Sequence, residues 1–334
     1  MSNGRKVLLT GATGFIGSAL ARVLCPAGFA VRTIVRRTSP RHHLAGLEME
    51  FYDGDICDRS SVRTALAGVQ YVFHVAADYR LWARRPSEIL KTNVGGTRIV
   101  MEEALRARVE RIVHTSSVAT LALHPHGDAA DESAQLSEDE ATGAYKRSKV
   151  AAERLVEQLV ANEGLPAVIV HPSTPVGPRD VRPTPTGRII VEAANGRIPA
   201  FVDTGLNLVH VDDVAAGHLA ALQHGRIGER YILGGENVPF GKMLGDISRL
   251  AGRRPPRLRI PHAMAVPVAY VAEGLALLSG KEPLATVDGM RMAKHHMYFT
   301  ARKAERELGF TARPYMLGLE HAIRWFREAG YVRM

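Results

Sequence analysis

The sequence holds few cysteines, and their arrangement excludes a cysteine-based metal site. Cys25 and Cys57 are the only two in 334 residues, and they match no metal-ligand spacing. Two isolated thiols in a chain of this length are typical of a protein that stays in a reducing compartment. The histidines also lack the helical spacing of metal ligands, so no metal site is expected.

Long hydrophobic runs are lacking as well. The longest apolar stretch, residues 263–278, is interrupted by Pro267 and Glu273 and is shorter than the ~20 residues that span a bilayer. The polar start of the chain, residues 1–6, leads into a strand pattern and is unlike a signal peptide. We therefore expect a cytoplasmic protein. The stretch 261–278 has two interpretations, a buried core helix or an apolar contact for a membrane surface or a lipid-bearing substrate.

Acidic residues are fewer than basic residues, and this imbalance indicates which binding partners the protein favours. The chain has 34 Asp and Glu against 43 Lys and Arg, a net charge of +9. Such a balance favours anionic partners, including phosphorylated cofactors and substrates. Aromatic residues make up only 6% and do not interleave with a basic run. A nucleic-acid partner is therefore not expected.

What the first half does contain is a regular alternation of strand and helix patterns. We expect strands over 6–10, 30–35, 48–52, 71–75, 111–115 and 167–171. Helices are expected over 18–24, 60–66, 95–106 and about 145–161, with Asp58 as the cap of the second. This alternation predicts an α/β fold, a doubly wound parallel sheet of the Rossmann type.

The character of the chain changes after Pro172. Five prolines crowd residues 172–185, which we expect to be loop. Residues 1–172, with 207–235 returning to them, are predicted to form the dinucleotide-binding domain. Residues 173–206 and 236–330 would form a smaller, discontinuous substrate-binding domain over the carboxyl edge of the sheet, where ligands bind in such folds.

A glycine-rich turn joins the first strand to the first helix. Three glycines stand in the pattern G-x-x-G-x-x-G, at Gly11, Gly14 and Gly17. The first allows the tight turn, the second allows a close approach of the pyrophosphate, and the third allows close packing of helix and strand. The free N–H groups of the helix start then face the phosphates. The cofactor-binding residues expected here are Gly11, Thr13, Gly14, Phe15, Ile16 and Gly17.

The end of the second strand bears on the choice of cofactor. Arg36 and Arg37 stand where a carboxylate would favour NAD(H). Arginines suit the 2′-phosphate instead, so we expect NADP(H) to be favoured over NAD(H). Asp55 follows the third strand, where it could meet the adenine or simply form a turn.

Tyr145 and Lys149 form the candidate catalytic pair. A spacing of four residues at the start of a helix puts both side chains on one face. An ammonium group beside the phenol is expected to lower the pKa of Tyr145 from about 10 toward neutrality, as proton transfer requires. Ser117 ends the fifth strand, where its hydroxyl can bind the oxygen of a reacting carbonyl or alcohol.

Taken in order, these motifs resemble those of the extended short-chain dehydrogenases, the group of sugar-nucleotide epimerases, dehydratases and dihydroflavonol-type reductases. The motifs that carry the resemblance are residues 10–17, 74–77, 93–97, 115–117, 145–149 and 171–173. The resemblance implies that Ser117 binds the reacting oxygen, that Tyr145 is the acid/base and that Lys149 is its partner. By the same resemblance, the cofactor contacts are Arg36, Asp55, Ile56, Ala76, Ala77, Lys149, Pro172 and Ser173, and Asn93 supports the site.

A closer resemblance links the chain to the hopanoid-associated sugar epimerase family of bacteria. It is carried by residues 74–82, 171–180, 183–188, 203–213 and 231–237. Membership implies a role in hopanoid lipid biosynthesis, with a sugar-like or lipid-linked substrate, and the wider class implies a homodimer. The residues expected to line the substrate pocket are Asp78, Tyr79, Trp82 and Thr174, with residues 172–188 forming a cap.

The reaction itself is left with three candidates. A dehydratase is disfavoured, because Val118 and Ala119 occupy the positions where such enzymes carry an Asp-Glu pair. A net reductase that uses NADPH and a nucleotide-sugar epimerase that recycles NAD would use the same Ser117, Tyr145 and Lys149. A non-catalytic NADP(H)-sensing protein is the third reading, which the presence of all three residues disfavours.

Overall fold

The structure is a computed structural model that describes residues 4–124, 127–279, 283 and 285–333. A seven-stranded parallel sheet forms its centre. The spatial order is β10-β6-β5-β4-β1-β2-β3, so the chain starts in the middle and winds outward in both directions. This is the expected doubly wound fold, extended by one strand at the β6 edge. The strands are β1 (Lys6–Thr10), β2 (Ala30–Val35), β3 (Met49–Asp53), β4 (Tyr71–His74), β5 (Arg111–Thr115), β6 (Ala167–Pro172) and β10 (Arg230–Leu233).

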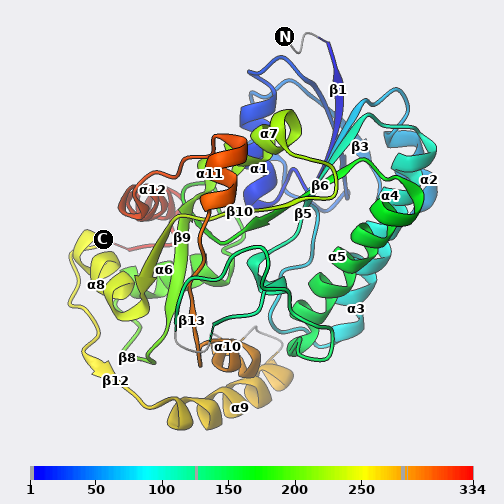
Figure 1. Ribbon diagram of the computed structural model, residues 1–334. Coiled ribbons are helices and arrows are strands. Elements are labelled where there is room, and N and C mark those ends of the chain that lie inside the picture. The colour runs from blue at the N-terminus through cyan, green and yellow to red at the C-terminus, as the bar shows by residue number, and fades with distance from the viewer. Residues whose placement is uncertain (1–3, 125–126, 280–282, 284, 334) are drawn as a thin grey trace.

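Helices cover both faces of this sheet (Figure 1). One face carries α1 (Phe15–Leu24), α7 (Val211–His224) and α11 (Arg302–Leu308). The other carries α2 (Arg59–Ala65), α3 (Pro86–Leu90), α4 (Thr97–Arg106) and α5 (Gly143–Glu163). Burial on both faces explains why the strands read as continuous apolar runs. Along β1, for example, Val7 and Leu9 pack under α1 and α7, whereas Leu8 packs under α4 and α5.

Local sequence signals account for most of the helix boundaries. Asp58 caps α2 as expected, accepting hydrogen bonds from the backbone N–H groups of Ser60 and Ser61. The helix predicted over 95–106 is longer than expected, because α3 and a π-helical turn, η2 (Lys91–Gly96), run into α4. Two single-turn 3₁₀ helices, η1 (His42–Leu44) and η3 (Val118–Thr120), follow β2 and β5.

A second, smaller sheet lies beyond the carboxyl edge of the large one. Its central strand, β9 (Gly205–His210), pairs with β7 (Thr174–Val176), β11 (Glu236–Pro239) and β13 (His296–Met297). A two-stranded ribbon is formed by β8 (Ala200–Phe201) and β12 (Leu258–Arg259). The surrounding helices are α6 (Pro185–Ala194), α8 (Phe240–Leu250), α9 (His262–Ser279), α10 (Val287–Met292) and α12 (Tyr315–Glu328).

The chain returns once from this smaller part to the large sheet. Within 207–235, helix α7 packs against α1 and β10 joins β6, while β9 stays in the small sheet. The segment therefore crosses between the two sheets at His210. The residue before α7 is also its cap, since the imidazole of His210 accepts a hydrogen bond from the N–H of Asp212 at 3.1 Å.

The prediction of loop throughout residues 172–185 is wrong. Strand β7 lies inside this stretch, and α6 begins at Pro185. Pro175 is tolerated because β7 pairs only with β9 and has a free edge, where a missing N–H costs no hydrogen bond. Pro185 suits the first turn of α6, which Thr184 caps by accepting from the N–H of Gly187 at 3.1 Å.

Candidate active site

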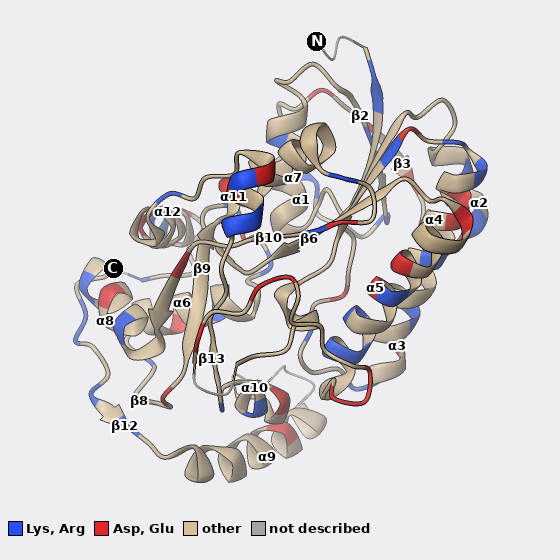
Figure 2. Cartoon of the chain, in the orientation of Figure 1, with Lys and Arg blue, Asp and Glu red and all other residues tan. Residues whose placement is uncertain are grey.

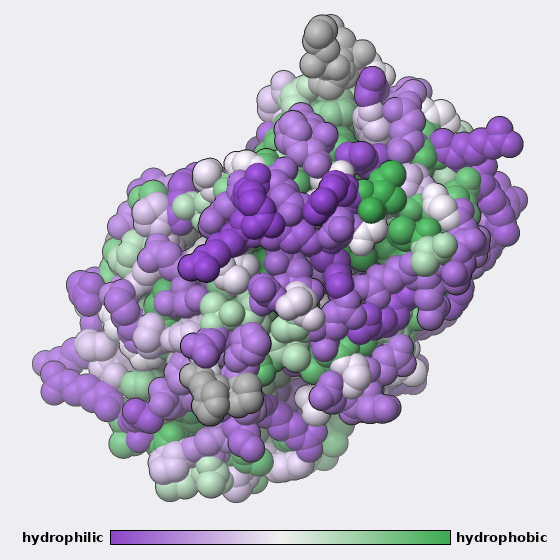
Figure 3. Space-filling model, in the orientation of Figure 1, coloured by the Kyte–Doolittle hydropathy of each residue, from purple (hydrophilic) through white to green (hydrophobic). Residues whose placement is uncertain are grey.

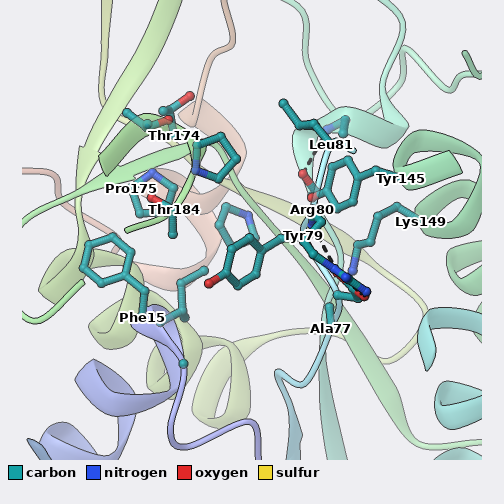
Figure 4. A pocket seen from close by; sticks show the side chains of 18 of the residues that line it. Phe15, Ala77, Tyr79, Arg80, Leu81, Tyr145, Lys149, Thr174, Pro175 and Thr184 are labelled. Carbon is teal, nitrogen blue, oxygen red and sulfur yellow. Dashed lines mark hydrogen bonds and ion pairs between the residues drawn. The ribbon is translucent and has the colours of Figure 1, made fainter. Parts of the chain in front are cut away.

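A large cleft of about 1320 Å³ separates the carboxyl edge of the large sheet from the smaller part. The glycine-rich turn and the ends of β2, β4, β5 and β6 form one wall, and residues from 172–189 and 283–299 form the other. Figure 4 shows Tyr145 and Lys149 on one side of the cavity, with Phe15, Thr174, Pro175 and Thr184 on the opposite side. This is the edge at which ligands sit in open parallel sheets.

The glycine-rich turn is built so tightly that side chains cannot enter it. Gly11 has φ +74°, and a Cβ there would lie 2.7 Å from the backbone nitrogen of Ala76. A Cβ on Gly17 would overlap the carbonyl oxygen of Gly11. Gly14 instead caps α1 without a side-chain hydrogen bond and lines the cleft. The N–H groups at the start of α1 therefore face a cavity whose shape fits a bound phosphate.

The two arginines after β2 differ in where they point. Arg36 lines the cleft, as does Ser39 three residues later. Arg37 is not among the lining residues: its side chain is 89% exposed, and its Nε lies 3.8 Å from the carboxylate of Asp53. Of the two arginines predicted to contact the cofactor, Arg36 therefore lines the cleft, whereas the side chain of Arg37 is directed to solvent. The sequence did not predict Ser39 as a cleft residue. It reaches the cleft through a turn in which its N–H donates to the carbonyl oxygen of Arg36 at 2.9 Å.

The remaining residues expected at the cofactor lie where the motifs put them. Asp55, Ile56, Ala76, Ala77, Pro172 and Ser173 all line the cleft. Asp55 also closes a turn, because its carboxylate accepts from the N–H of Cys57 at 2.9 Å. Thr10 ties the glycine turn to the end of β4: its hydroxyl accepts from the N–H of Ala76 and contacts His74 Nδ1 at 2.9 Å. Thr10 and His74 thus hold the two loops that flank the cofactor position.

The three candidate catalytic residues come together in the cleft. Ser117 follows β5, and Tyr145 and Lys149 lie on successive turns of α5. Lys149 is buried, and its ammonium group donates to the carbonyl oxygen of Thr115 at 2.9 Å. The lysine is therefore fixed in orientation by the strand end that also presents Ser117.

The pKa values in this group correct one expectation. Burial raises the pKa of Tyr145 above its ordinary value, and the hydrogen bond with Ser117 opposes that rise. The predicted lowering of the Tyr145 pKa toward neutrality is wrong for this arrangement. Burial also lowers the pKa of Lys149, to about 8, while the carboxylate of Glu153 acts in the opposite direction. A phenol with this environment is protonated at pH 7 and ready to donate its proton.

Asn93 holds the catalytic helix from the side. It lies in η2 and is buried, and its side-chain amide donates to Ser148 Oγ and to the carbonyl oxygen of Asp78, both at 2.9 Å. Its own carbonyl accepts from the N–H of Asp78 at 2.7 Å. Single π-turns inside helices are often found at functional sites, and this one points Asn93 at α5. These contacts give a physical basis to the role that the family resemblance implies for Asn93, which is to support the site.

A buried carboxylate lies one turn beyond Lys149, and sequence reasoning missed it. Glu153 accepts hydrogen bonds from Ser116 Oγ and contacts His171 Nε2 at 2.9 Å. These bonds hold the pKa of Glu153 well below its usual range despite burial. The spacing of Tyr145, Lys149 and Glu153, four residues apart each time, could have indicated a continuous polar stripe. A polar stripe facing the sheet, however, is visible only once β5 and β6 are placed beneath it.

The substrate end of the cleft agrees in part with expectation. Asp78, Tyr79 and Thr174 line it, but Trp82 does not. Trp82 was expected there because it follows β4 closely, yet the cleft-lining residues of this loop end at Leu81. The cap formed by 172–188 contributes Asp180 and Thr184 to the cleft. The backbone N–H and the hydroxyl of Thr184 both donate to the carboxylate of Asp180, at 2.9 and 2.8 Å. Burial raises the pKa of Asp180 to about 7.

One part of the cleft wall had no signal in the sequence. It consists of apolar side chains from distant segments: Ile189, Val202, Leu206, Phe240, Met290, Met297 and Phe299. These residues come from α6, α8, α10, β9, β13 and the adjoining loops, and Leu206 alone lies in a stretch that carried a family resemblance. The cleft thus joins a polar reaction centre to an apolar region.

Comparison with known proteins agrees with this geometry. The sequence model described as "NAD dependent epimerase/dehydratase family" matches residues 7–234. A protein of Synechocystis sp., named provisionally as a dihydroflavonol 4-reductase, is 41% identical over 97% of this chain and 95% of its own. "Sterol demethylase protein B" of Methylococcus capsulatus is 37% identical over 97% of this chain and 99% of its own.

A solved structure shows the same fold at higher identity. The crystal structure of gox2253 superposes with a TM-score of 0.89 and 49% sequence identity, covering 99% of this chain and 100% of that one. Both sheets are therefore shared across the full length. The roles assigned to the site residues by motif are predictions, and the common position of these residues in the cleft supports them.

Proposed function

Because this chain belongs to the NAD dependent epimerase/dehydratase family, within the extended short-chain dehydrogenases, we propose that it is an NADP(H)-dependent reductase of a sugar-like or lipid-linked carbonyl compound. An oxidoreductase or epimerase that uses a nicotinamide cofactor is the activity common to this family. The observation that carries the finer proposal is the arrangement of Ser117, Tyr145 and Lys149 in one cleft with the glycine turn and Arg36.

The cleft fits a dinucleotide in a way that can be traced to single residues. A Cβ at Gly11 or Gly17 would close the turn, so these positions keep the start of α1 open to a pyrophosphate. Arg36 and Ser39 offer a charge and a hydroxyl at the end of β2, where a 2′-phosphate would lie. When bound, NADPH supplies a hydride to the carbonyl carbon of the substrate.

The residues of the chain supply the proton and the orientation. Ser117 binds the carbonyl oxygen, and Tyr145 donates its phenolic proton to that oxygen as the C–O double bond is reduced to an alcohol. The raised pKa of Tyr145 keeps this proton in place at neutral pH, which suits an acid better than a base. Lys149 places a positive charge beneath the site and stabilises the phenolate that remains.

Arg36 favours a net reductase over a cofactor-recycling epimerase. Its side chain stands where an NAD enzyme would place a carboxylate for the ribose 2′-OH. The family description keeps a nucleotide-sugar epimerase as the second candidate, since Ser117, Tyr145 and Lys149 serve both reactions. Retention of a tyrosine, a lysine and a serine in contact with the cleft supports catalysis rather than cofactor sensing alone.

The substrate we propose is amphipathic. Thr174, Thr184 and Tyr79, which carry hydroxyl groups, line the cleft together with the apolar residues of its wall. A polar carbonyl-bearing side chain on an apolar body would match both regions. The resemblance to hopanoid-associated proteins suggests such a molecule, and the 37% identical sterol demethylase relative carries a name from lipid chemistry.

Cofactor selectivity is the first test. We expect titration with reduced nicotinamides, followed by fluorescence, to show at least a tenfold preference for NADPH over NADH. Arg36→Ala should weaken NADPH binding by about tenfold or more, in line with the loss of a charge-assisted contact to phosphate, and should leave NADH binding nearly unchanged. Arg37→Ala is the matched control, because its side chain points outward.

The reaction type is tested with the same protein. Net reduction predicts that NADPH is consumed in proportion to alcohol formed from a panel of sugar-like and apolar carbonyl compounds. Tyr145→Phe should lower kcat by about 10²–10⁴ while NADPH still binds. NAD(H) retained through purification, together with sugar epimerisation without net NADPH use, would sink the reductase and favour the epimerase.

A further inference from the structure

Helix α9 is unusual in having apolar side chains on both of its sides. Its inner side carries Ala265, Ala269 and Ala276, which are buried. Its outer side carries Met264, Val268, Val271, Leu275 and Leu278, each at least 60% exposed. Tyr270 and Leu277 add to this outer surface. Of the thirteen large hydrophobic residues that are exposed in the described parts of the chain, seven belong to α9, so the exposure is concentrated rather than scattered.

The outer residues form one continuous stripe. The steps from 264 to 268, 271, 275 and 278 are four, three, four and three residues, which keeps the side chains on one face of the helix. Figure 2 shows α9 without charge along nearly its whole length, and Figure 3 shows hydrophobic side chains at the lower edge, where Figure 1 places α9. The interpretation as a buried core helix thus holds for one face only, because the other face is exposed.

The segment that leads into α9 is strongly basic. Arg253, Arg254, Arg257 and Arg259 precede the helix and are all exposed, as is Leu258 between them. No acidic residue occurs from 247 to 272. A row of cations next to an exposed apolar helix complements an anionic lipid surface, in which head groups carry the charge and acyl chains lie just beneath.

The helix is tied to the protein body at both ends, which decides how it can meet a bilayer. At its start, β12 pairs with β8 and His262 hydrogen-bonds to the carbonyl of Met290. Near its end, Glu273 accepts from the N–H of Val287 at 2.8 Å and Arg84 donates to the carbonyl of Leu277 at 2.8 Å. The 18 residues are long and apolar enough to cross a membrane by composition alone. With both ends held on the same side, the helix can only lie in the plane of the surface.

The inner face of α9 connects this surface to the cleft. Ala265 packs with Val202, Met290 and Ala293, and these three residues also line the cleft wall. The apolar region of the cleft is therefore separated from the exposed stripe by one layer of side chains.

We propose that the outer face of α9, together with Arg254 and Arg257, is an interfacial site that docks the protein on an anionic lipid bilayer. The proposal goes beyond the reductase reaction and does not rest on it, because surface binding can be measured without a substrate. The bilayer would then also be the source of a lipid-bearing substrate.

Vesicle flotation with the full-length protein tests the site. We expect binding to vesicles of equimolar phosphatidylcholine and phosphatidylglycerol, and much weaker binding to phosphatidylcholine alone. The double variant Val271→Glu/Leu275→Glu should lower the vesicle partition coefficient at least tenfold. Arg254→Gln/Arg257→Gln should lower it by about fivefold for each arginine removed, the effect of one basic residue at an anionic surface, and added salt should do the same.

A matched control separates the site from general effects of added charge. Ile227→Glu places the same change at an exposed apolar residue outside α9 and should leave vesicle binding unchanged. All variants should keep NADPH binding and their unfolding midpoint, which shows that they fold. Absence of flotation with either lipid mixture would overturn the proposal. A dimer in light scattering that Val271→Glu/Leu275→Glu dissociates would instead assign the face to a second copy of the chain.

Discussion

At the scale of single residues, the site depends on charges that are buried under the sheet edge. Tyr145, Lys149 and Glu153 form a stripe along α5, and each has its pKa displaced by its surroundings. Glu153 is the member farthest from the cleft, and it acts on the reaction only through Lys149. It is therefore a positioning residue, held in place by Ser116 and His171.

The pH dependence of the reductase follows from Lys149. Below a pH of about 8 the lysine is charged and can stabilise the phenolate of Tyr145; above that pH the charge is lost and the rate should fall. Glu153 raises the pKa of Lys149, so Glu153→Gln should move this fall to lower pH. The measurement is kcat against pH with saturating NADPH.

Glu157→Gln provides the comparison, since Glu157 lies one turn farther along α5 and pairs with Arg154 and Arg230 instead. Its pH profile should match that of the unaltered enzyme. A Glu153→Gln variant that binds NADPH normally and shows an unshifted profile would contradict the coupling. A merely structural role for Glu153 would lower the rate at every pH without moving the profile.

At the scale of elements, the glycine turn and the start of α1 act as one unit. The closeness of Gly17 to Gly11 fixes the angle at which the helix leaves β1, whereas Gly14 lines the cleft with only one backbone atom, Gly11 O, near its Cβ position. Substituting alanine at Gly17 and at Gly14 should therefore have different effects.

Gly17→Ala should lower the free energy of unfolding by about 1–3 kcal/mol, because the new Cβ overlaps the carbonyl of Gly11 and the backbone must move. Gly14→Ala should be much less destabilising, because its Cβ would meet only Gly11 O, at 3.2 Å, yet it should weaken NADPH binding. Denaturant unfolding and NADPH titration of both variants separate the two effects. Equal losses of stability would show that the turn has more freedom than its contacts indicate.

At the scale of the whole molecule, the cleft exists because two sheets are held at a fixed distance. Asn207 in β9 is buried and hydrogen-bonds to three segments at once. Its amide nitrogen donates to Gly235 O, Asn237 Oδ1 and Phe299 O, and its carbonyl accepts from Gly235 N at 2.8 Å. These contacts join the exit of β10, in the large sheet, to β11 and to the segment after β13.

Asn207→Ala should lower the free energy of unfolding by about 3 kcal/mol, since it leaves several buried polar groups without partners. The apolar cleft wall should loosen at the same time, so the KM for an amphipathic substrate should rise more than kcat falls. Asn162→Ala, at an exposed position on α5, should change stability by less than about 0.5 kcal/mol. Urea unfolding of the two variants is the measurement; similar midpoints would contradict a clamp at Asn207.

The sequence alone determined the large sheet and most of the cofactor side of the cleft. Each strand of that sheet is a short apolar run followed by a helix pattern, and motifs at strand ends are brought to one edge by the parallel arrangement. For this reason Gly11, Asp55, Ala76 and Ser117 could be placed together before any coordinates were known. Their positions depend on local signals and on a topology that allows few alternatives.

Tertiary structure decided the features that depend on distant segments or on side-chain direction. Arg36 and Arg37 are neighbours in sequence, yet only Arg36 lines the cleft, whereas Arg37 is exposed and its Nε lies 3.8 Å from Asp53 on β3. The rise in the Tyr145 pKa comes from burial, which depends on the folded arrangement and is not given by the spacing of residues. The composition of the α9 segment leaves a core helix and a lipid contact both open, and only packing shows that one of its faces has nothing from the described chain to cover it. Periodicity records which residues share a face, whereas what covers that face is settled by the rest of the fold.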